Sequence, residues 1–310
     1  IMTIVLPHGV LFRGGEEGTI RKNLIENNHI DTIIGLPANI FFGTGIPTII
    51  MVLKQKRDNN DVLIIDASKG FIKDGKNNKL RASDIKRIAD TVAARVSVPK
   101  FSKVVSREEI RQNDYNLNIP RYVDSSESAE TWDIYASMFG GIPVSEVDNL
   151  AEYWNAFPNL RTELFRQNDT PYLQLSCDNI KSAICGSSDI NRFEQAYQLA
   201  FDGFEDYLRT ELIENAVSVK ITQEETTISE NIFSRLAGVQ LVDKYEGYQL
   251  LDDEWVKIAV DLEIIQTEGF EAAKKVDPNI VIKKKDGKEQ EVQEGWIGHI
   301  IPFELVQTTL

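Results

Sequence analysis

Short apolar runs alternate with stretches of helical spacing along the first part of the chain. Four runs are predicted strands because they are rich in β-branched and apolar residues. The first two are each followed by a proline. The predicted strands are Thr3–Leu6, Ile30–Leu36, Thr48–Lys54 and Val62–Asp66. Between the first two, Thr19–Asn27 has the apolar spacing of a helix, with Thr19 as its N-cap. A strand, a helix and a strand in series predict an α/β layer with parallel strands.

The connection between the second and third strands predicts a local exception. It runs from Leu36 to Thr48, about eleven residues with no helical period, so a crossover helix hardly fits. We therefore expect these two strands to be antiparallel neighbours. Further on, Lys73–Asn78 is a polar turn, a helix capped by Ser83 extends to about Val96, and Ser106–Glu109 forms a capping box that opens a short helix.

The pattern of apolar positions changes after residue 124. We predict one domain over 1–124, a small polar linker over 125–144, and a helical domain over 145–310 with a β-hairpin near 280–292 that turns at Asp286-Gly287. Apolar spacing of three and four residues indicates the helices. They are Ser145–Ala156, Pro158–Gln167, Asp178–Cys185, Asp189–Glu214, Gln223–Leu236 and Asp243–Thr267.

Composition adds little to this picture. The chain has 310 residues, with 42% hydrophobic and 26% charged residues, as in ordinary soluble globular proteins. The longest apolar run, Ile46–Leu53, is too short to span a bilayer, and no signal peptide is visible. Cys177 and Cys185, the only cysteines, fit reduced thiols. We therefore expect a cytoplasmic protein without membrane contact.

The net charge of −14 conceals an asymmetry. Residues 1–123 hold 19 Lys and Arg against 13 Asp and Glu, whereas the rest of the chain holds 15 against 35. Ten basic residues and three acidic ones lie within Lys69–Lys103. Such a segment suits contact with DNA phosphates, although a solvated basic hairpin and helix fits the sequence equally well.

Most site motifs are missing. His8, His29 and His299 are scattered and neither cysteine belongs to a CxxC pair, so we predict no metal site. The chain contains no GxxxxGK[ST], GxGxxG or GxSxG sequence. Phosphate-loop, dinucleotide and nucleophile-elbow chemistry are thus excluded at the level of motifs.

Three blocks remain, VLPHGVLFRGG, IIGLPANIFFGTGIPTIIMVLK and NDYNLNIPRYV, beginning at Val5, Ile33 and Asn113. In sequence, order and spacing they resemble the later half of the modification (methyltransferase) subunit of type I restriction–modification systems, a DNA adenine-N6 methyltransferase. The similarity runs through most of the chain. It implies the C-terminal portion of a methyltransferase-type doubly wound α/β sheet with an antiparallel edge hairpin, followed by a mostly α-helical domain.

The resemblance also implies a reaction, methyl transfer from S-adenosylmethionine to the N6 amine of an adenine flipped out of duplex DNA. In the family, a glycine-rich turn holds the cofactor and an Asn-Pro-Pro-aromatic segment accepts the amine protons. This chain contains no Asn-Pro-Pro, and its first strand resembles the strand just after that motif. We therefore expect no catalytic residues here, an incomplete cofactor site, and no activity from the chain alone. The alternative is a non-enzymatic subunit-interaction or DNA-binding module.

One family role transfers to a residue of this chain. An aromatic ahead of the hairpin's last strand stacks on the flipped adenine, and Phe42 matches that position. Phe41 would then be core, because a strand buries alternate residues, although both rings being core is also compatible. Gly43, Thr44, Gly45 and Pro47 would form the wall of the target-base pocket, or a simple tight turn.

Other family blocks suggest weaker assignments. Pro7, His8 and Gly9 resemble a block near the cofactor or the pocket, but a lone histidine after a strand is more often structural. The amides after Gly14-Gly15 could meet a phosphate at a helix N-terminus, or form a solvated turn. The candidate phosphate contacts are Arg13, Lys69, Lys73, Lys76, Lys79, Arg81, Lys86 and Arg87.

The remaining expectations concern packing and partners. Tyr115, Asn116 and Asn118 lie in the third block and favour structural hydrogen bonding over DNA contact. The family implies duplex DNA, a specificity subunit, a restriction subunit and a second modification subunit as partners. Long amphipathic stretches such as Asp189–Glu214 suit helix–helix association with the specificity subunit, although packing within the domain explains any single helix more simply.

Overall fold

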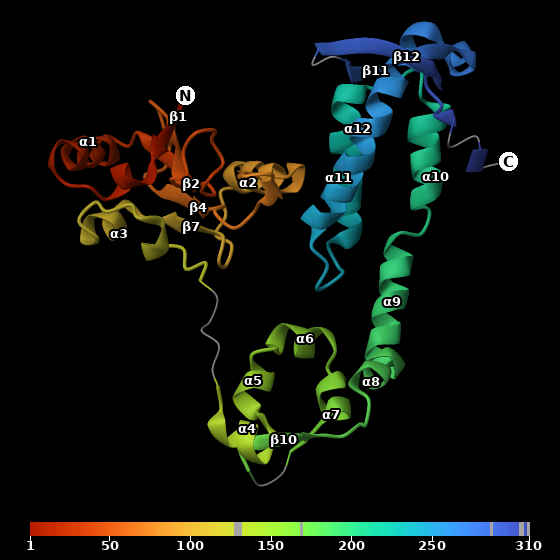
Figure 1. The fold of residues 1–310 in the computed structure, drawn as a ribbon. Helices are drawn as coiled ribbons and strands as arrows, with labels where there is room; N and C mark the ends of the chain where they lie inside the picture. The colour runs from red at the N-terminus through yellow and green to blue at the C-terminus, as the bar shows by residue number, and fades with distance from the viewer. Residues whose placement is uncertain (127–131, 168–169, 286–287, 304–306, 309–310) are drawn as a thin grey trace. The chain divides into compact units, whose positions relative to one another are not determined.

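The computed structural model describes residues 1–126, 132–167, 170–285, 288–303 and 307–308. The chain forms two compact units, Ile1–Trp132 and Asp133–Leu310, drawn in red to yellow and in green to blue in Figure 1. Within the described ranges, no helix combines the length and the apolar character that crossing a membrane requires.

The first unit follows the predicted order with additions. Its strands are β1 (Met2–Pro7), β2 (Ile30–Gly35), β3 (Thr48–Leu53), β4 (Val62–Asp66), β5 (Ile72–Asp74), β6 (Asn77–Lys79) and β7 (Ser102–Val105). Its helices are α1 (Gly15–Glu26), α2 (Ala82–Ala94) and α3 (Arg107–Gln112), with 3-10 turns η1 (His8–Leu11) and η2 (Ile119–Arg121).

The main sheet has the order β1-β3-β2-β4-β7. β2 and β3 are antiparallel neighbours as predicted, and β2 and β4 are parallel. β1 is also antiparallel to β3, so β1 and β2 run in the same direction with β3 between them. The predicted edge position of the antiparallel hairpin is wrong, because β4 and β7 continue the sheet beyond β2. β4 is apolar on both faces and therefore requires an interior position.

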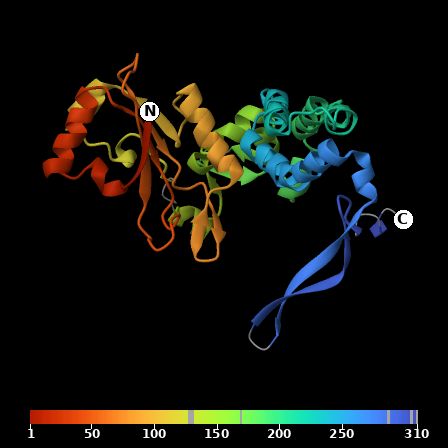
Figure 2. The ribbon, with the colours of Figure 1, turned by 90° about the horizontal axis from the view of Figure 1, so that it is seen from above.

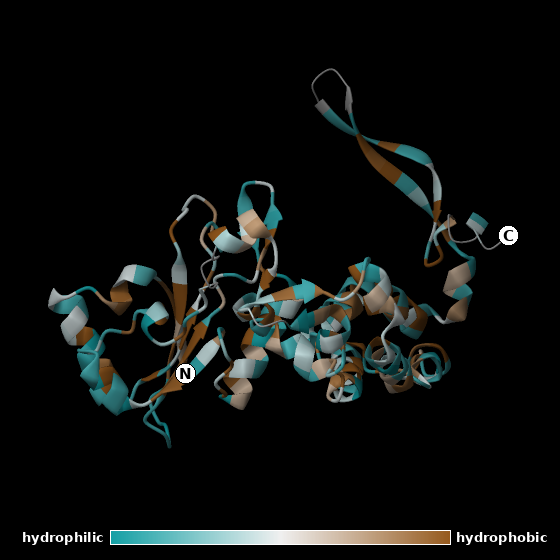
Figure 3. Cartoon of the chain, turned by 90° about the horizontal axis from the view of Figure 1, so that it is seen from below, coloured by the Kyte–Doolittle hydropathy of each residue, from teal (hydrophilic) through white to brown (hydrophobic). Residues whose placement is uncertain are grey.

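Helices cover both faces of this sheet. Ile33 and Ile64 point to the face that Ile25 of α1 and Ile110 of α3 cover, whereas their neighbours in sequence point to the face that α2 covers with Ile88 and Val92. Figure 2 shows α1 and α2 on opposite sides of the strands. Figure 3 shows the same strands as a brown, hydrophobic layer beside a largely teal α1. The sheet is therefore an α/β layer buried on both sides.

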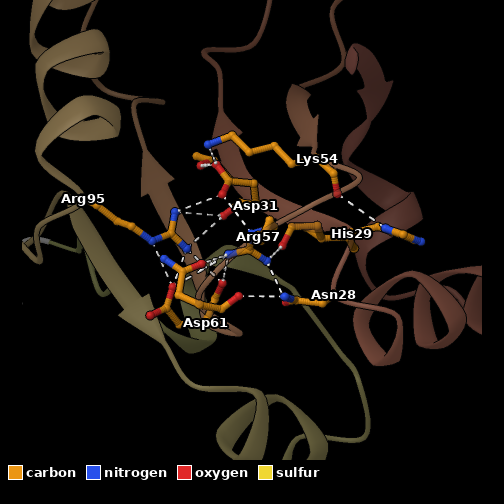
Figure 4. A network of polar contacts seen from close by, with 10 residues as sticks. Asn28, His29, Asp31, Lys54, Arg57, Asp61 and Arg95 are labelled. Carbon is orange, nitrogen blue, oxygen red and sulfur yellow. Dashed lines mark hydrogen bonds and ion pairs between the residues drawn. The ribbon is translucent and has the colours of Figure 1, made fainter. Parts of the chain in front are cut away.

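A buried ionic network joins the amino ends of β2 and β4 (Figure 4). The Asp31 carboxylate, with 4% of its side chain exposed, is 3.0 Å from both Arg57 Nε and Lys54 Nζ and 3.3 Å from Arg95 Nη1. Arg57 also donates to the Ile30 carbonyl, and Arg95 pairs with Asp61. Because Arg95 follows α2, the network links that helix to both strands.

Two predicted helix caps are wrong. α1 begins four residues before Thr19, whose hydroxyl donates to the Gly15 carbonyl within the helix at 3.2 Å. α2 begins at Ala82, and Arg81 is its N-cap, with the Asp84 carboxylate accepting from the Arg81 amide, so Ser83 is inside the first turn. The predicted cap at Ser106 is confirmed, because its hydroxyl accepts from the Glu109 amide at 3.2 Å.

The second unit is mostly helical. Its helices are α4 (Ile134–Phe139), α5 (Val144–Asp148), α6 (Ala151–Ala156), α7 (Leu160–Leu164), α8 (Ile180–Gly186), α9 (Ser188–Ala200), α10 (Phe204–Arg209), α11 (Ile221–Leu236) and α12 (Lys244–Glu268), with a π turn η3 (Thr210–Glu214) and a 3-10 turn η4 (Phe270–Lys274). Its strands are β8 (Ile142–Pro143), β9 (Phe165–Gln167) and β10 (Tyr172–Leu175) in one sheet and the hairpin β11 (Val276–Lys285) and β12 (Lys288–Gly298).

The second unit departs from the sequence expectation at several points. The predicted helix Ser145–Ala156 is divided into α5 and α6, and the predicted helix Pro158–Gln167 ends as strand β9. α4 and β8 fold within the range predicted as linker, where the Asp133 carboxylate caps α4, and residues 127–131 of that range lie outside the described residues. The predicted helix Asp189–Glu214 is broken after α9, where Gly203 takes a left-handed φ of 68°. The hairpin extends beyond 280–292, and its predicted Asp286-Gly287 turn also lies outside the described residues.

Candidate functional site

Three strands of the first unit end at the same edge of the sheet. β1, β2 and β4 run in one direction, and their registers bring Pro7, Gly35 and Asp66 to that edge. In α/β sheets the carboxyl edge of such strands is where ligands bind. The site can therefore be sought among the residues that follow these three strands.

A pocket of about 210 Å³ lies at this edge. Backbone contacts close its sides, because the His8 amide donates to the Pro47 carbonyl at 3.4 Å and the Ala67 amide donates to the Gly35 carbonyl at 2.9 Å. The lining residues are His8, Gly35, Leu36, Pro47, Thr48, Asp66, Ser68, Ile119 and Pro120. The pocket thus unites segments from four separate parts of the sequence.

Two titratable side chains line the pocket. Burial lowers the pKa of the His8 imidazole and the Asp66 charge only partly offsets this, so His8 is neutral at pH 7. The Asp66 carboxylate accepts from the Ser68 amide at 3.0 Å and from the Ser125 hydroxyl at 2.5 Å. The Asp66 carboxyl group, beside a neutral imidazole, favours ligands that donate hydrogen bonds and disfavours anions such as phosphate.

The loop between β2 and β3 rises from the same edge. Its base is closed by the Leu36 amide, which donates to the Thr48 carbonyl at 2.9 Å, and it turns at Gly43 with φ 82°. The Phe42 side chain is 96% exposed at this turn. Leaving a phenylalanine in water forgoes roughly 1.5–3 kcal/mol of burial, and the exposed ring is open to stacking by a ligand.

The prediction that Phe41 is core is wrong, because its side chain is 40% exposed. Residues 36–47 form a loop and not a strand, so strand alternation does not apply to the pair. Ile40 packs instead against the cluster of buried residues on the face of the sheet that α2 covers. Of the predicted pocket residues, Pro47 lines the pocket, whereas Phe42, Gly43, Thr44 and Gly45 form the loop beside it.

Six of the eight predicted phosphate contacts have partners within the protein. Arg13 pairs with Glu17, Lys69 donates to the Ser125 carbonyl, Arg81 pairs with Asp84, and Lys86 pairs with Asp90. Lys73 lies over the Phe71 ring and Arg87 lies over the Phe101 ring. Lys73, Lys76 and Lys79 are exposed together on the β5–β6 hairpin. Asp74 is exposed on the same hairpin, which keeps a net positive charge and so suits contact with a polyanion.

The predicted anion site at the start of α1 is weaker. A hollow of about 510 Å³ lies there, lined in part by Gly14, Gly15, Lys22 and Arg121. However, Glu16 and Glu17 occupy the first turn of the helix. Two carboxylates at that position oppose the binding of another anion, so the solvated turn is the better description.

The third sequence block forms a wall of the site. Ile119 packs so closely on Gly35 that a Cβ on that glycine would be 2.6 Å from Ile119 Cδ1. Tyr115 donates to Glu26 at 2.7 Å, and the Asn116 side chain accepts from the Asn118 amide at 2.9 Å. These bonds agree with the structural interpretation of the block.

Sequence reasoning missed Gly35, Asp66, Ser68, Ile119 and Pro120 as pocket residues. A usable signal was present, because Asp66 ends a buried apolar run and so marks a strand's carboxyl edge. Using it required knowing that β4 lies beside β2, which a local pattern does not reveal.

The pocket is small for a whole cofactor. At about 210 Å³ it falls below the roughly 300–1,000 Å³ of typical small-molecule sites, so it does not fit the entire S-adenosylmethionine molecule. Across the described ranges, no three His, Cys, Asp or Glu side chains gather as metal ligands would. The dimensions of the pocket suit a single planar ring or part of one.

Comparison with known proteins bears on the first unit. Residues 2–131 match the N-6 DNA Methylase family. A type I restriction enzyme methylase subunit (MpnII) of Mycoplasma pneumoniae is 41% identical over 132 residues, covering 42% of this chain and 24% of the relative. The MjaVIII methylase subunit of Methanocaldococcus jannaschii is 40% identical over 137 residues, with the same coverage. The chain thus spans about a quarter of the length of these relatives.

Among solved structures, a type I restriction-modification methyltransferase subunit from Streptococcus thermophilus is similar. It is 57% identical, with a TM-score of 0.40, and the match covers 40% of this chain and 26% of that one. Residues 2–131, which hold the edge pocket and the Phe42 loop, thus match the N-6 DNA Methylase family and are similar to part of the methylase subunits of type I restriction enzymes.

Proposed function

We propose that this chain belongs to the modification subunit of a type I restriction–modification system, which methylates the N6 amine of adenine in duplex DNA. The similarity of residues 2–131 to methylase subunits supports the family, and the exposed Phe42 beside the edge pocket supports a target-base role. S-adenosylmethionine, when bound, supplies the methyl group. The residues of this chain bind and orient the extruded base.

In this proposal Phe42 stacks on the face of the extruded adenine. Stacking of a base on an aromatic ring contributes about 1–3 kcal/mol, or roughly 5- to 150-fold in binding. The pocket lined by Asp66 lies beside the Phe42 loop. Its carboxylate accepts hydrogen bonds, and the exocyclic amine of adenine can donate one. The exposed lysines of the β5–β6 hairpin contact the backbone of the duplex.

The test uses the complete methylase with its partner subunits and two duplexes, one with 2-aminopurine at the target position to report flipping and one with adenine there to report methylation. Phe42→Ala is expected to reduce both the fluorescence gain on flipping and the methylation rate by 5- to 150-fold, while Phe42→Trp retains them. Phe41→Ala is the matched control and is expected to have a smaller effect. Equal effects of the two alanine variants would contradict the assignment.

We further propose that the 310-residue chain alone does not transfer methyl groups, since its sequence contains no Asn-Pro-Pro-aromatic segment. Incubation of the chain with DNA and tritiated cofactor tests this directly. Background-level incorporation is expected, whereas measurable turnover would overturn the proposal.

A second role, partner binding, is proposed for the helical unit. An apolar groove of about 580 Å³ lies among α9, α10, α11 and α12, and Leu250, 71% exposed, is part of its lining. Other lining residues include Tyr197, Phe201, Phe204, Leu208, Ile228, Ile232 and Leu236. Exposed apolar surface of this kind marks protein–protein contacts. The partners suggested by the family are the specificity subunit, the restriction subunit and a second modification subunit.

Leu250→Asp tests this role. The specificity subunit is expected to co-purify less with this variant, because a charge is placed in an apolar contact. Leu199→Asp, on α9 but outside the groove and 74% exposed, is the matched control and is expected to leave the complex intact. Loss of the complex in both variants, or in neither, would argue against the groove.

A further inference from the structure

The loop that presents Phe42 is hydrogen-bonded to another part of the first unit. It lies against the small β5–β6 hairpin, which begins at Ile72, 30 residues after Phe42. Asn78 of β6 makes the contact, with 6% of its surface exposed. Its amide donates to the Asn39 carbonyl at 2.9 Å, and its side-chain nitrogen donates to the Ala38 carbonyl at 2.6 Å.

These two bonds fix a strained part of the loop. Asn39 has a left-handed φ of 55°, a conformation that costs energy for residues other than glycine. The same conformation brings Asn39 Oδ1 to within 3.0 Å of the position that a Cβ of Gly45 would occupy. The two arms of the loop are therefore in contact directly below the turn at Phe42 and Gly43.

Burying the polar side chain of Asn78 costs free energy wherever a hydrogen-bonding atom is left unpaired. Its side-chain oxygen is buried without a hydrogen-bond partner, which destabilises the protein, yet its side-chain nitrogen makes the short bond to the loop. An apolar residue at this position would avoid the unpaired oxygen but could not hold the Ala38 carbonyl.

Resting on the proposed function, we propose that Asn78 is a positioning residue for Phe42. It fixes the start of the loop, Asn39 transmits that position to Gly45, and the Phe42 ring is held ready to stack on the extruded base. The hairpin that carries Asn78 also carries Lys73, Lys76 and Lys79, so contact with the DNA backbone and presentation of the ring are mechanically linked. A fixed ring loses less conformational freedom when it binds.

The experiment is a double-mutant cycle in the complete methylase, with 2-aminopurine fluorescence and single-turnover methylation as readouts. Asn78→Ala removes only the side-chain bond, because the backbone bond to Asn39 remains. With Phe42 present, the variant is expected to lower the flipping signal roughly 2- to 12-fold, the range of one hydrogen bond. In the Phe42→Ala background it is expected to have no further effect, since Asn78 acts through that ring.

Two further variants keep the result interpretable. Asn78→Asp retains the size and the backbone bond but places an oxygen against the Ala38 carbonyl, so it is expected to match or exceed the alanine effect. Asn77→Ala, on the same strand, is the control and is expected to behave as wild type. Native-state hydrogen exchange of the β2 and β4 amides is expected to change little in Asn78→Ala and Asn77→Ala, which checks that the first unit stays folded.

Each outcome decides between the two proposals. If Phe42→Ala leaves flipping unchanged, the base-stacking function and the inference both fail. If Phe42→Ala abolishes flipping but Asn78→Ala has no effect, or an equal effect in both backgrounds, only the positioning role of Asn78 is overturned.

Discussion

Replacing Asp31 with alanine is expected to destabilise the first unit strongly. The carboxylate accepts from Arg57 Nε at 3.0 Å and Thr32 Oγ1 at 2.9 Å and pairs with Lys54 and Arg95. Arg57 has only 2% of its side chain exposed. Without Asp31, its nearest carboxylate is that of Asp61, whose Oδ1 lies 3.8 Å from Arg57 Nη2.

The size of the effect follows from that burial. Removing one partner of a buried ion pair leaves an uncompensated charge and costs about 3–5 kcal/mol. Single domains have total stabilities of about 5–15 kcal/mol, so the variant loses a large fraction of the stability of the unit. Exposed ion pairs contribute about 0–1 kcal/mol, which sets the value expected if the network were unimportant.

Because the chain has two units, a global melting curve mixes their transitions. Native-state hydrogen exchange of the β2 and β4 amides reports the first unit alone. Asp58→Ala, an exposed carboxylate in the neighbouring loop, is the control and is expected to remain within about 0.5 kcal/mol of wild type. A loss below about 1 kcal/mol for Asp31→Ala would refute the reasoning.

The pH dependence gives an independent check. Burial alone would raise the pKa of the Asp31 carboxyl, but hydrogen bonds from Lys54 and Thr32 and the Arg95 charge outweigh it, so the pKa lies below its ordinary value of 3.8. A lowered pKa in the folded state means that stabilisation is fully present above pH 3.8 and is lost as pH falls through the folded value. Asp31→Asn is expected to remove this part of the acid dependence.

Three further predictions concern other contacts. Hydrogen bonds from Arg111 and then Tyr115 lower the pKa of Glu26 to about 2, so the contact of α1 with α3 is expected to persist below pH 4.5 and to be lost as pH approaches 2, as followed by NMR of the Arg111 side chain. The bond from His299 to Asp277 raises the pKa of His299, so its stabilisation of the hairpin base is expected below pH 6.5 and to disappear as pH rises above the folded value; NMR titration of the imidazole measures it. Gly35→Ala is expected to cost about 1–3 kcal/mol by overpacking against Ile119, and Ile119→Val is expected to restore part of that loss in denaturation experiments.

Local pattern predicted the strands of the first unit well. The runs at Ile30–Leu36 and Val62–Asp66 are apolar throughout, as expected for strands covered on both faces, and β2 and β4 match them closely. β7, with the sequence SKVV, escaped prediction because its short mixed pattern resembles a loop. Its strand state depends on pairing with β4, a distant segment.

The site was predicted only where it is contiguous in sequence. Phe42 and its loop stand in one block, whereas the pocket beside them combines His8, Gly35 and Ile119 from the three blocks with Asp66, which lies outside all of them. Which of those meet is set by strand order, and a sequence pattern of period two does not specify strand order. The Phe41 assignment failed for the related reason that a loop was treated as a strand.

The position of β3 between β1 and β2 has a consequence for folding kinetics. β1, α1 and β2 precede β3 in the sequence, but the two strands do not pair with each other, because β3 lies between them. β3 pairs with both neighbours, so the sheet is complete only once the loop over residues 36–47 has closed. The entropic cost of closing a loop rises with its length, and slower closure slows folding. We therefore expect insertions in the segment that presents Phe42 to slow formation of the sheet as well.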